Sequence, residues 1–294
     1  MNIIKIGTRR SLLALKQAEL VKNALEKIGI FSEIIKIESS GDKIQNKPLW
    51  EIGGKGLFCK ELDKALINKE CDIAVHSAKD METELAVGTE IFATLPRQDV
   101  SDVFISKYTI ENIPSGAVIG TCSLRRKSQI LNIRDDLVIK SIRGNVETRL
   151  KKIEQGEFDA TFLAMAGLNR LGINADKWQK LSEFDFIPSS GQGTIAIQGL
   201  KTNTKIKQLL QKINDKNSFL QLSYERAFLS GVNGDCKTPV GAYAHIKKDG
   251  TVLLHTFYGD EFGKSVDKQI KIVKSSKDCY KLGEQIKLKS KILD

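Results

Sequence analysis

The chain has 294 residues, of which 41% are hydrophobic, and a formal net charge of +10. The length allows about two or three folded domains. The hydrophobic fraction excludes a chain that is disordered throughout. We find neither an apolar run long enough to span a membrane nor a signal peptide, and the five scattered cysteines lack metal-site spacing, so we expect a reduced cytoplasmic protein.

The chain begins with a predicted strand over residues 3–6, a turn, and a helix whose apolar residues recur at helical spacing from 12 to 28. The turn carries Arg9 and Ser11, which would lie beside the N-terminus of that helix. A helix N-terminus binds anions well, although a capped helix with an exposed arginine explains the same residues.

A short apolar run over residues 73–75 is followed at once by His76, Ser77, Lys79 and Asp80. The run predicts a buried strand, and in an open α/β sheet ligands bind at the carboxyl ends of the strands. This polar cluster is therefore placed where chemistry occurs. A solvated loop would also be polar, and the stretch alone does not decide between the two interpretations.

The motif Ile-Gly-Thr at residues 6–8 recurs at residues 119–121, again after a predicted strand and before a basic helix with an early serine. The repeat predicts two similar α/β domains that face each other across a cleft. In the second half, three predicted strand ends carry arginine, namely Arg125 with Arg126, Arg143, and Arg170. Such arginines are costly unless anions neutralise them, so they predict a ligand with several carboxylates or phosphates.

The last part of the chain predicts a small α+β domain. A loop with Cys236 between Asp235 and Lys237 follows a helix near residues 219–229. Beyond it, the pattern predicts three antiparallel strands and a closing helix. These elements are expected over residues 242–246, 252–257, 266–272 and 278–286.

Together, these motifs closely resemble one family, porphobilinogen deaminase, also called hydroxymethylbilane synthase. The resemblance spans nearly the whole chain, and the motifs stand in the family's order. They are Gly7-Thr8-Arg9 with Ser11, residues 53–58, residues 72–80, residues 120–126, Arg143-Gly144-Asn145 with Arg149, Ala166-Gly167-Leu168 with Arg170, Gly191-Gln192-Gly193, and the Cys236 loop.

The resemblance implies an α/β fold with two lobes like those of periplasmic binding proteins, each with a mixed five-stranded sheet. A small C-terminal α+β domain with a three-stranded antiparallel sheet would complete it. The expected domains are residues 1–96 with 194–215, residues 97–193, and residues 216–294.

The resemblance also implies an activity. The family joins four porphobilinogen molecules head to tail with loss of ammonia, starting from a covalently bound dipyrromethane cofactor, and then releases hydroxymethylbilane by hydrolysis. Each pyrrole carries an acetate and a propionate, which would explain the arginines. We therefore expect a monomeric enzyme with a small-molecule substrate, and neither a metal nor a nucleic-acid or membrane partner.

The family's roles carry over to matching positions. Cys236 is the expected attachment site of the dipyrromethane through a thioether, because a thiolate is a strong nucleophile. Asp80 is the expected catalytic carboxylate, which would stabilise positive charge on the pyrroles and relay protons. The other expected contacts are Asp80, Lys79, Ser77, Ser123, Arg125, Arg126 and Arg143 for the cofactor, and Arg9, Ser11, Lys55, Arg149, Arg170, Gln192, Phe58 and His76 for the substrate.

Two other classes of protein compete with this interpretation. A non-catalytic, two-lobed anion-binding protein would need the arginines but neither Asp80 nor a reactive Cys236, and it would usually carry an export signal. A nucleic-acid binder is suggested only by the net charge. Such a protein would need basic patches interleaved with aromatic residues, which make up only 6% of this chain.

Overall fold

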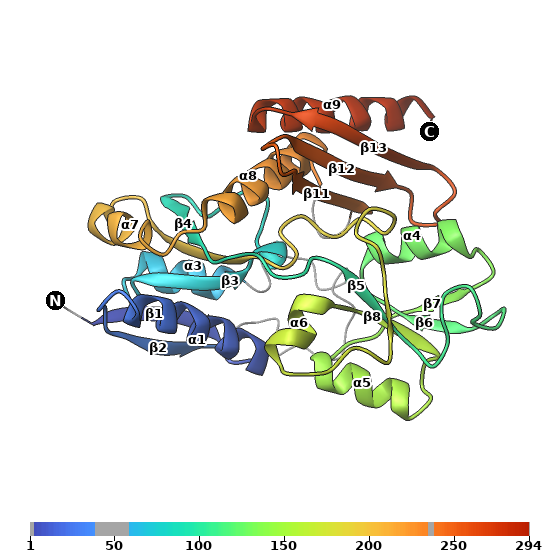
Figure 1. Ribbon diagram of the computed structural model, residues 1–294, viewed down its shortest axis with the longest axis horizontal. Coiled ribbons are helices and arrows are strands. Elements are labelled where there is room, and N and C mark those ends of the chain that lie inside the picture. Colours follow the sequence, from blue (N-terminus) through green and yellow to red (C-terminus); the bar gives the residue numbers. More distant parts are fainter. Residues whose placement is uncertain (1–2, 39–58, 235–237, 294) are drawn as a thin grey trace. The chain divides into compact units, whose positions relative to one another are not determined.

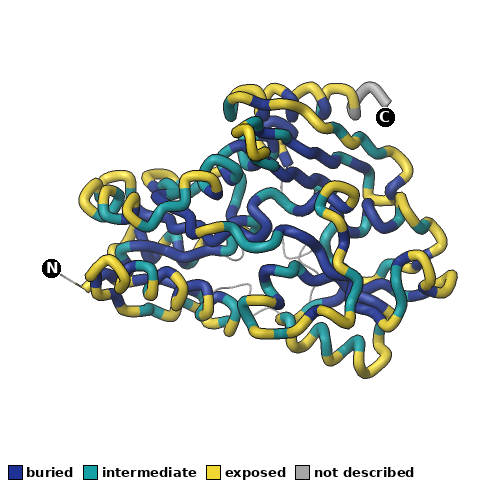
Figure 2. Tube along the Cα trace, in the orientation of Figure 1, coloured by how far each residue is buried: buried dark blue, intermediate teal, exposed yellow. Residues whose placement is uncertain are grey.

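The computed structural model describes residues 3–38, 59–234 and 238–293, which form two compact units (Figure 1). Unit 1 contains the described residues up to Gln98 together with Gly193–Leu220, and unit 2 contains Asp99–Gln192 together with the described residues from Gln221 onward. In both units the inner strands are mostly buried, while the edge strands and the outer faces of the helices are more exposed (Figure 2).

Unit 1 is built on one mixed sheet of five strands. Its elements are β1 (Ile4–Arg9), α1 (Leu12–Glu26), β2 (Ser32–Ile37), α3 (Lys60–Ile67), β3 (Ile73–Ser77), the 3₁₀ turn η1 (Ala78–Asp80), β4 (Thr89–Thr94), β10 (Ile195–Leu200) and α7 (Thr204–Leu210). The strand order is β2-β1-β3-β10-β4, in which β1 is parallel to β2 and β3, and β10 is antiparallel to both of its neighbours.

Different helices cover the two faces of this sheet. On one face, Val21 and Leu25 of α1 pack with residues of β1, β3 and α7. On the other face, Leu62 of α3 packs against Cys71. A Cβ atom at Gly7 would lie only 2.6 Å from the Cys71 sulfur, so a glycine is needed where β1 passes this residue.

Unit 2 contains a second mixed sheet of five strands and a separate antiparallel sheet. The elements around the mixed sheet are β5 (Asp102–Ile105), β6 (Val118–Gly120), α4 (Leu124–Ile133), β7 (Val138–Lys140), α5 (Val146–Glu154), β8 (Ala160–Ala164), α6 (Met165–Arg170) and β9 (Gln179–Lys180). The strand order is β7-β6-β8-β5-β9. The strands β7, β6 and β8 are parallel, and β5 is antiparallel to both of its neighbours.

The two mixed sheets therefore share one topology: three parallel strands, an antiparallel fourth and an edge strand. The antiparallel fourth strand is β10 in unit 1 and β5 in unit 2. In each case it is the first strand after the chain enters that unit from the other one. The repeated Ile-Gly-Thr motif lies at equivalent places, on β1 and at the end of β6. This confirms the predicted fold class of two similar α/β sheets.

The C-terminal sheet consists of three antiparallel strands in the order β11-β12-β13, as predicted. Its elements are α8 (Lys216–Gly231), β11 (Val240–Ile246), β12 (Val252–Gly259), β13 (Val266–Val273) and α9 (Ser276–Leu293). The helix α9 lies along this sheet (Figure 1). A Cβ atom at Gly231 or Gly283 would overlap the backbone of the other helix, so the two glycines let α8 and α9 pack closely.

Several boundaries differ from the sequence prediction. The predicted turn over Gly7 to Arg9 was wrong: these residues belong to β1 and pair with residues 35–37 of β2. Arg170, expected at the end of a strand, lies in the helix α6 that follows β8, and the sequence did not predict β5 or α7. The C-terminal sheet belongs to the same compact unit as the second mixed sheet. The division of the chain into three domains therefore stays a prediction.

In the part of the chain that the structure describes, no helix is long and apolar enough to cross a membrane. Nor do these residues include a group of His, Cys, Asp and Glu side chains that could hold a metal ion.

His255 of β12 is expected to make the stability of the C-terminal sheet depend on pH. It is 5% exposed, and its ring centroid lies 5.0 Å from that of Phe184. Burial lowers the pKa of His255, with a further lowering by His245 and an opposing effect of Glu183. The folded protein therefore favours the neutral imidazole, and this stabilisation is fully present above the unfolded pKa of about 6.5.

As the pH falls from about 6.5 through the lowered pKa of the folded state, protonation should destabilise the fold. We expect His255→Gln to flatten the decline of the melting temperature between about pH 6.5 and pH 5. Thermal unfolding followed at several pH values measures this. A variant that declines as steeply as the parent protein would show that His255 does not cause the effect.

Candidate active site

A polar pocket of about 60 Å³ opens in unit 1, where β1 and β3 end. Five of the predicted site residues line it together, namely Arg9, Ser11, His76, Ser77 and Asp80. Arg9 and Ser77 are the last residues of β1 and β3, which are parallel strands. The structure thus places these side chains at the carboxyl ends of neighbouring strands, as the sequence predicts.

The helix α1 begins directly at this pocket. Ser11 is its N-cap, and the serine oxygen accepts a hydrogen bond from the backbone N–H of Ala14 at 3.4 Å. The first turn of α1 therefore adds a positive dipole end beside Arg9. This arrangement suits a carboxylate.

Gln17 is a pocket residue that the sequence interpretation missed. It is 2% exposed on α1, and its Nε2 donates to the Ser77 hydroxyl at 2.7 Å. The same hydroxyl donates back to Gln17 Oε1 at 3.1 Å. This pair fixes the Ser77 side chain at the end of β3. The available signal was a polar residue next to Ala18, on the apolar face of the predicted helix.

Cys59 also lines the pocket and supports the turn that carries Asp80. Its sulfur lies 3.7 Å from His76 Nδ1 and donates to the backbone carbonyl of Asp80 at 3.3 Å. Burial, together with the negative charges of Asp80, Asp63 and Glu82, raises the pKa of the Cys59 thiol to about 12. Cys59 is therefore a protonated donor at neutral pH, and it leaves the exposed Asp80 carboxylate available.

A second polar group lies in unit 2 around Asp102, the first residue of β5. Asp102 is 0% exposed and forms ion pairs with two arginines of α4. Arg125 Nη1 lies 2.8 Å from Asp102 Oδ2, and Arg126 Nη2 lies 2.6 Å from Asp102 Oδ1. Burial alone would raise the pKa of Asp102, but the charges of the two arginines hold it below its usual value.

The remaining hydrogen bonds of these arginines go mostly to the backbone of unit 2. Arg125 donates to the carbonyl of Ile187 at 2.8 Å and to the Ser189 hydroxyl at 3.0 Å. Arg126 donates to the carbonyl of Phe162 at 3.0 Å. Both guanidinium groups are thus held in fixed positions, with side chains only 3% and 9% exposed.

Gln192 belongs to the same buried group. It is 0% exposed, and its Nε2 donates to the carbonyl of Val100 at 2.6 Å and to Asp102 Oδ1 at 3.2 Å. The sequence prediction that clustered arginines need a bound anion therefore does not follow for Arg125 and Arg126, because Asp102 supplies a carboxylate from within the chain. Ligand contacts by these two arginines and by Gln192 stay predictions.

The other predicted residues of unit 2 lie on separate elements. Ser123 is the N-cap of α4 and accepts from its backbone at 3.4 Å, which matches the role of Ser11 in unit 1. Arg149 of α5 donates to the carbonyl of Gly144 at 2.9 Å. Arg143 lies just before α5, and Arg170 ends α6. Burial lowers the pKa of Arg170 to about 10, so it remains charged at neutral pH.

Lys79 lies half-buried within η1, beside Asp80 in the chain. The predicted residues Lys55, Phe58 and Cys236 lie outside the described residues.

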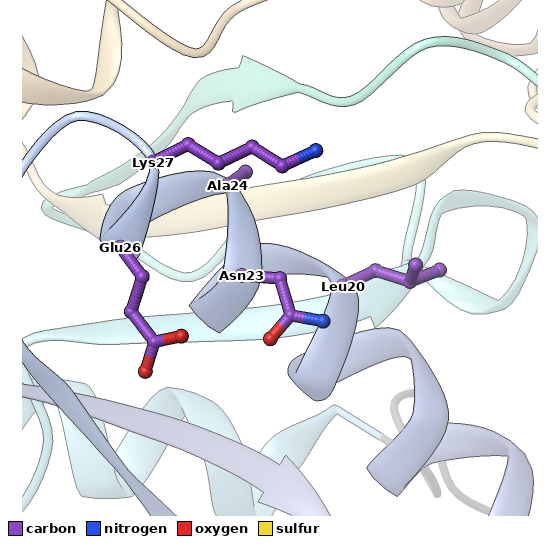
Figure 3. Close-up of a pocket in the computed structure, with 5 residues that line it drawn as sticks. All are labelled: Leu20, Asn23, Ala24, Glu26 and Lys27. Carbon is purple, nitrogen blue, oxygen red and sulfur yellow. The ribbon is translucent and has the colours of Figure 1, made fainter.

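A second depression lies on α1, away from the predicted residues. It has a volume of about 600 Å³ and is lined by Leu20, Asn23, Ala24, Glu26 and Lys27. Four of these residues belong to the last turns of α1 and Lys27 is its C-cap, and their side chains do not converge on a common point (Figure 3). It lacks the convergent polar groups that fix a ligand.

Fold and site together define a duplicated α/β protein that carries a small antiparallel sheet with helices and has a polar pocket at the strand ends of unit 1. A family model described as "Porphobilinogen deaminase, dipyromethane cofactor binding domain" matches residues 4–208, and one described as "Porphobilinogen deaminase, C-terminal domain" matches residues 219–293. The chain belongs to the porphobilinogen deaminase family.

Curated relatives agree with this assignment. A porphobilinogen deaminase of Nitrobacter winogradskyi is 47% identical over 255 residues, which cover 83% of this chain and 79% of the relative. That of Maridesulfovibrio salexigens is 44% identical, covering 90% of this chain and 87% of the relative. A chloroplastic porphobilinogen deaminase of Pisum sativum is 44% identical, covering 90% of this chain and 74% of the relative.

Solved structures that are similar to this chain are more distant. A nutrient binding protein from Burkholderia cenocepacia, bound to methionine, has a TM-score of 0.45 at 13% identity, covering 74% of this chain and 93% of that protein. A lipoprotein of the YaeC family from Enterococcus faecalis has a TM-score of 0.44 at 15% identity, with the same coverage. The family assignment rests on the sequence relatives.

Proposed function

We propose that this protein joins four porphobilinogen molecules head to tail, releasing ammonia at each step, and then releases hydroxymethylbilane by hydrolysis. Chain growth starts on a dipyrromethane held through a thioether to Cys236. The observation that carries the proposal is the pocket of unit 1, where Arg9, Ser77 and Asp80 meet. It lies within the residues that match the dipyromethane cofactor binding domain.

The described residues of this pocket fit a dipyrromethane chemically. The cofactor's acetate and propionate groups need cations and hydroxyl donors, which Arg9 and Ser11 provide beside one cavity. Ser77 lines the same cavity, with its hydroxyl held by Gln17. When bound, the cofactor supplies the pyrrole carbon to which the next pyrrole is joined. The residues of this pocket would hold its carboxylates and pyrrole N–H groups.

The state of the other thiols supports Cys236 as the attachment site. Burial raises the pKa of Cys59, Cys71 and Cys279 to about 12, so these three are protonated at neutral pH. Cys122 is half-buried and lies 3.0 Å from both the Ser141 hydroxyl and the carbonyl of residue 142. Attachment requires a thiolate, which the three buried cysteines cannot readily form.

Asp80 is the proposed catalytic residue. As ammonia leaves, positive charge develops on the substrate, and a nearby carboxylate stabilises that charge. The attacking pyrrole must then lose a proton, which the same carboxylate can accept. Two hydrogen bonds fix the turn that presents this side chain. The Cys59 thiol donates to the backbone carbonyl of Asp80, and the Met81 N–H donates to the Ala78 carbonyl.

The arginines of unit 2 are proposed to bind the substrate and cofactor carboxylates. Ser123 and the first turn of α4 offer backbone donors of the same kind as those at Ser11. Arg143, Arg149 and Arg170 add positive charge on other elements of the unit. A charge-assisted bond to a carboxylate is roughly twice as strong as a neutral one.

Arg143→Leu is expected to lower the fraction of protein that carries the cofactor about tenfold or more, because a hydrogen bond to a charged group contributes about 1.5–3 kcal/mol. Lys140→Leu, which removes an exposed charge three residues earlier, serves as the control. The measurement is the intact mass of each purified variant. An Arg143→Leu protein that is loaded as fully as the control would remove Arg143 from this role.

Incubation of the purified protein with porphobilinogen tests the function itself. We expect ammonia to appear at four molecules for each hydroxymethylbilane formed. The competing class, a non-catalytic anion-binding protein, would bind porphobilinogen and release none. We also propose that the protein acts as a cytoplasmic monomer, which sedimentation and cell fractionation would check.

A further inference from the structure

We propose that Asp102 is a positioning residue for carboxylate binding in unit 2. It holds the guanidinium groups of Arg125 and Arg126 together and cancels one of their two charges, so that the pair suits a single carboxylate. This inference rests on the proposed function, in which the two arginines bind carboxylates of the pyrroles.

The first support is geometric. Arg125 and Arg126 are consecutive residues of α4, and side chains of consecutive helical residues point in different directions. Here both guanidinium groups nevertheless reach one carboxylate. Arg125 contacts Oδ2 at 2.8 Å and Arg126 contacts Oδ1 at 2.6 Å. Asp102 is thus the group that brings the two arginines together.

The second support is the rigidity of the group. Gln192 Nε2 donates to Asp102 Oδ1 at 3.2 Å, and the carbonyls of Ile187 and Phe162 each accept from one arginine. Neither guanidinium group can turn without breaking buried hydrogen bonds. A ligand would therefore meet a preorganised pair and would not have to order it.

The third support is the charge balance. Asp102 forms ion pairs with both Arg125 and Arg126, so its carboxylate is shared between them. Burial raises the Asp102 pKa, but the charges of the two arginines hold it below its usual value. Two cations and one anion leave a single positive charge. Nη1 of Arg125 contacts Asp102 and the Ile187 carbonyl, and Nε donates to the Ser189 hydroxyl. Among the contacts of the described residues, Nη2 of Arg125 takes part in none. One donor group thus remains for one carboxylate.

The first experiment uses Asp102→Ala and added formate, and reads out cofactor loading by intact mass. The truncated side chain leaves room for a small carboxylate between the arginines. We expect loading to fall about tenfold and to recover when cells or refolding mixtures are supplied with formate. Asp63→Ala is the matched control, because Asp63 also accepts a glutamine amide, from Gln198 at 2.8 Å, in unit 1. Its loading should not respond to formate.

The second experiment uses Asp102→Asn and Arg126→Gln, with inorganic phosphate as a competing anion. Loss of the Asp102 charge leaves two cations, so phosphate should inhibit Asp102→Asn at a several-fold lower concentration than the parent protein, while KM for porphobilinogen rises more than kcat falls. Arg126→Gln leaves no net charge in the pair, so phosphate should inhibit it more weakly. Rates are taken per loaded molecule.

Two results would overturn the inference. One is an Asp102→Ala protein that loads fully without formate, or stays unloaded with it. The other is an Asp102→Asn protein with the parent's KM and phosphate inhibition. Failure of the proposed function is distinguishable, because the parent protein itself would then release no ammonia from porphobilinogen.

Discussion

Asp80→Asn is expected to fold, to keep its covalent cofactor, and to turn over porphobilinogen about 100- to 1,000-fold more slowly than the parent protein. Asp80 is exposed at the end of η1, so the variant leaves no buried group unpaired. The Cys59 thiol donates to the backbone carbonyl of Asp80, and this bond does not involve the carboxylate. The substitution therefore removes one negative charge and little else.

The loss should appear in kcat, because the carboxylate acts on charge that develops only as ammonia leaves. Glu82→Gln is the matched control, since it removes a carboxylate two residues along the same segment. Single-turnover kinetics on loaded protein, with intact mass as the check on loading, separates chemistry from cofactor assembly. Near-normal turnover by Asp80→Asn would exclude Asp80 from catalysis.

Cys236→Ser is expected to lose the covalent dipyrromethane and to fall below about one thousandth of the parent activity, as when a nucleophile is removed. A serine hydroxyl is far less acidic than a thiol and does not replace it as a nucleophile at neutral pH. Cys122→Ser is the control, because Cys122 is the half-buried thiol among the described cysteines. That variant should remain loaded. An adduct that persisted on Cys236→Ser would place the attachment on another residue.

The sequence predicted much of unit 1's site because local signals there agree with the fold. Residues 73–75 predicted a buried strand, and β3 contains them. The repeated Ile-Gly-Thr predicted two similar halves, and the two mixed sheets share one topology. In both halves a serine caps the helix that follows, at 3.4 Å from a backbone N–H. These are local features of strand and helix ends, which periodicity and capping residues reveal.

What the sequence could not reveal depends on contacts between distant segments. The strand β5 was not predicted, so Asp102 was not recognised as the partner of Arg125, 23 positions further along the chain. Gly7 was interpreted as a turn signal, whereas its lack of a side chain admits the Cys71 sulfur. Gln17 and Cys59 could be assigned to the site only from the packing of α1 and of the start of α3 against β3.

The most direct test of the account is the intact mass of the protein purified from cells that make porphobilinogen, before and after substrate is added. We predict the polypeptide plus two pyrrole units, and then further increments of one pyrrole unit each. A bare polypeptide mass that does not change with substrate would contradict the account.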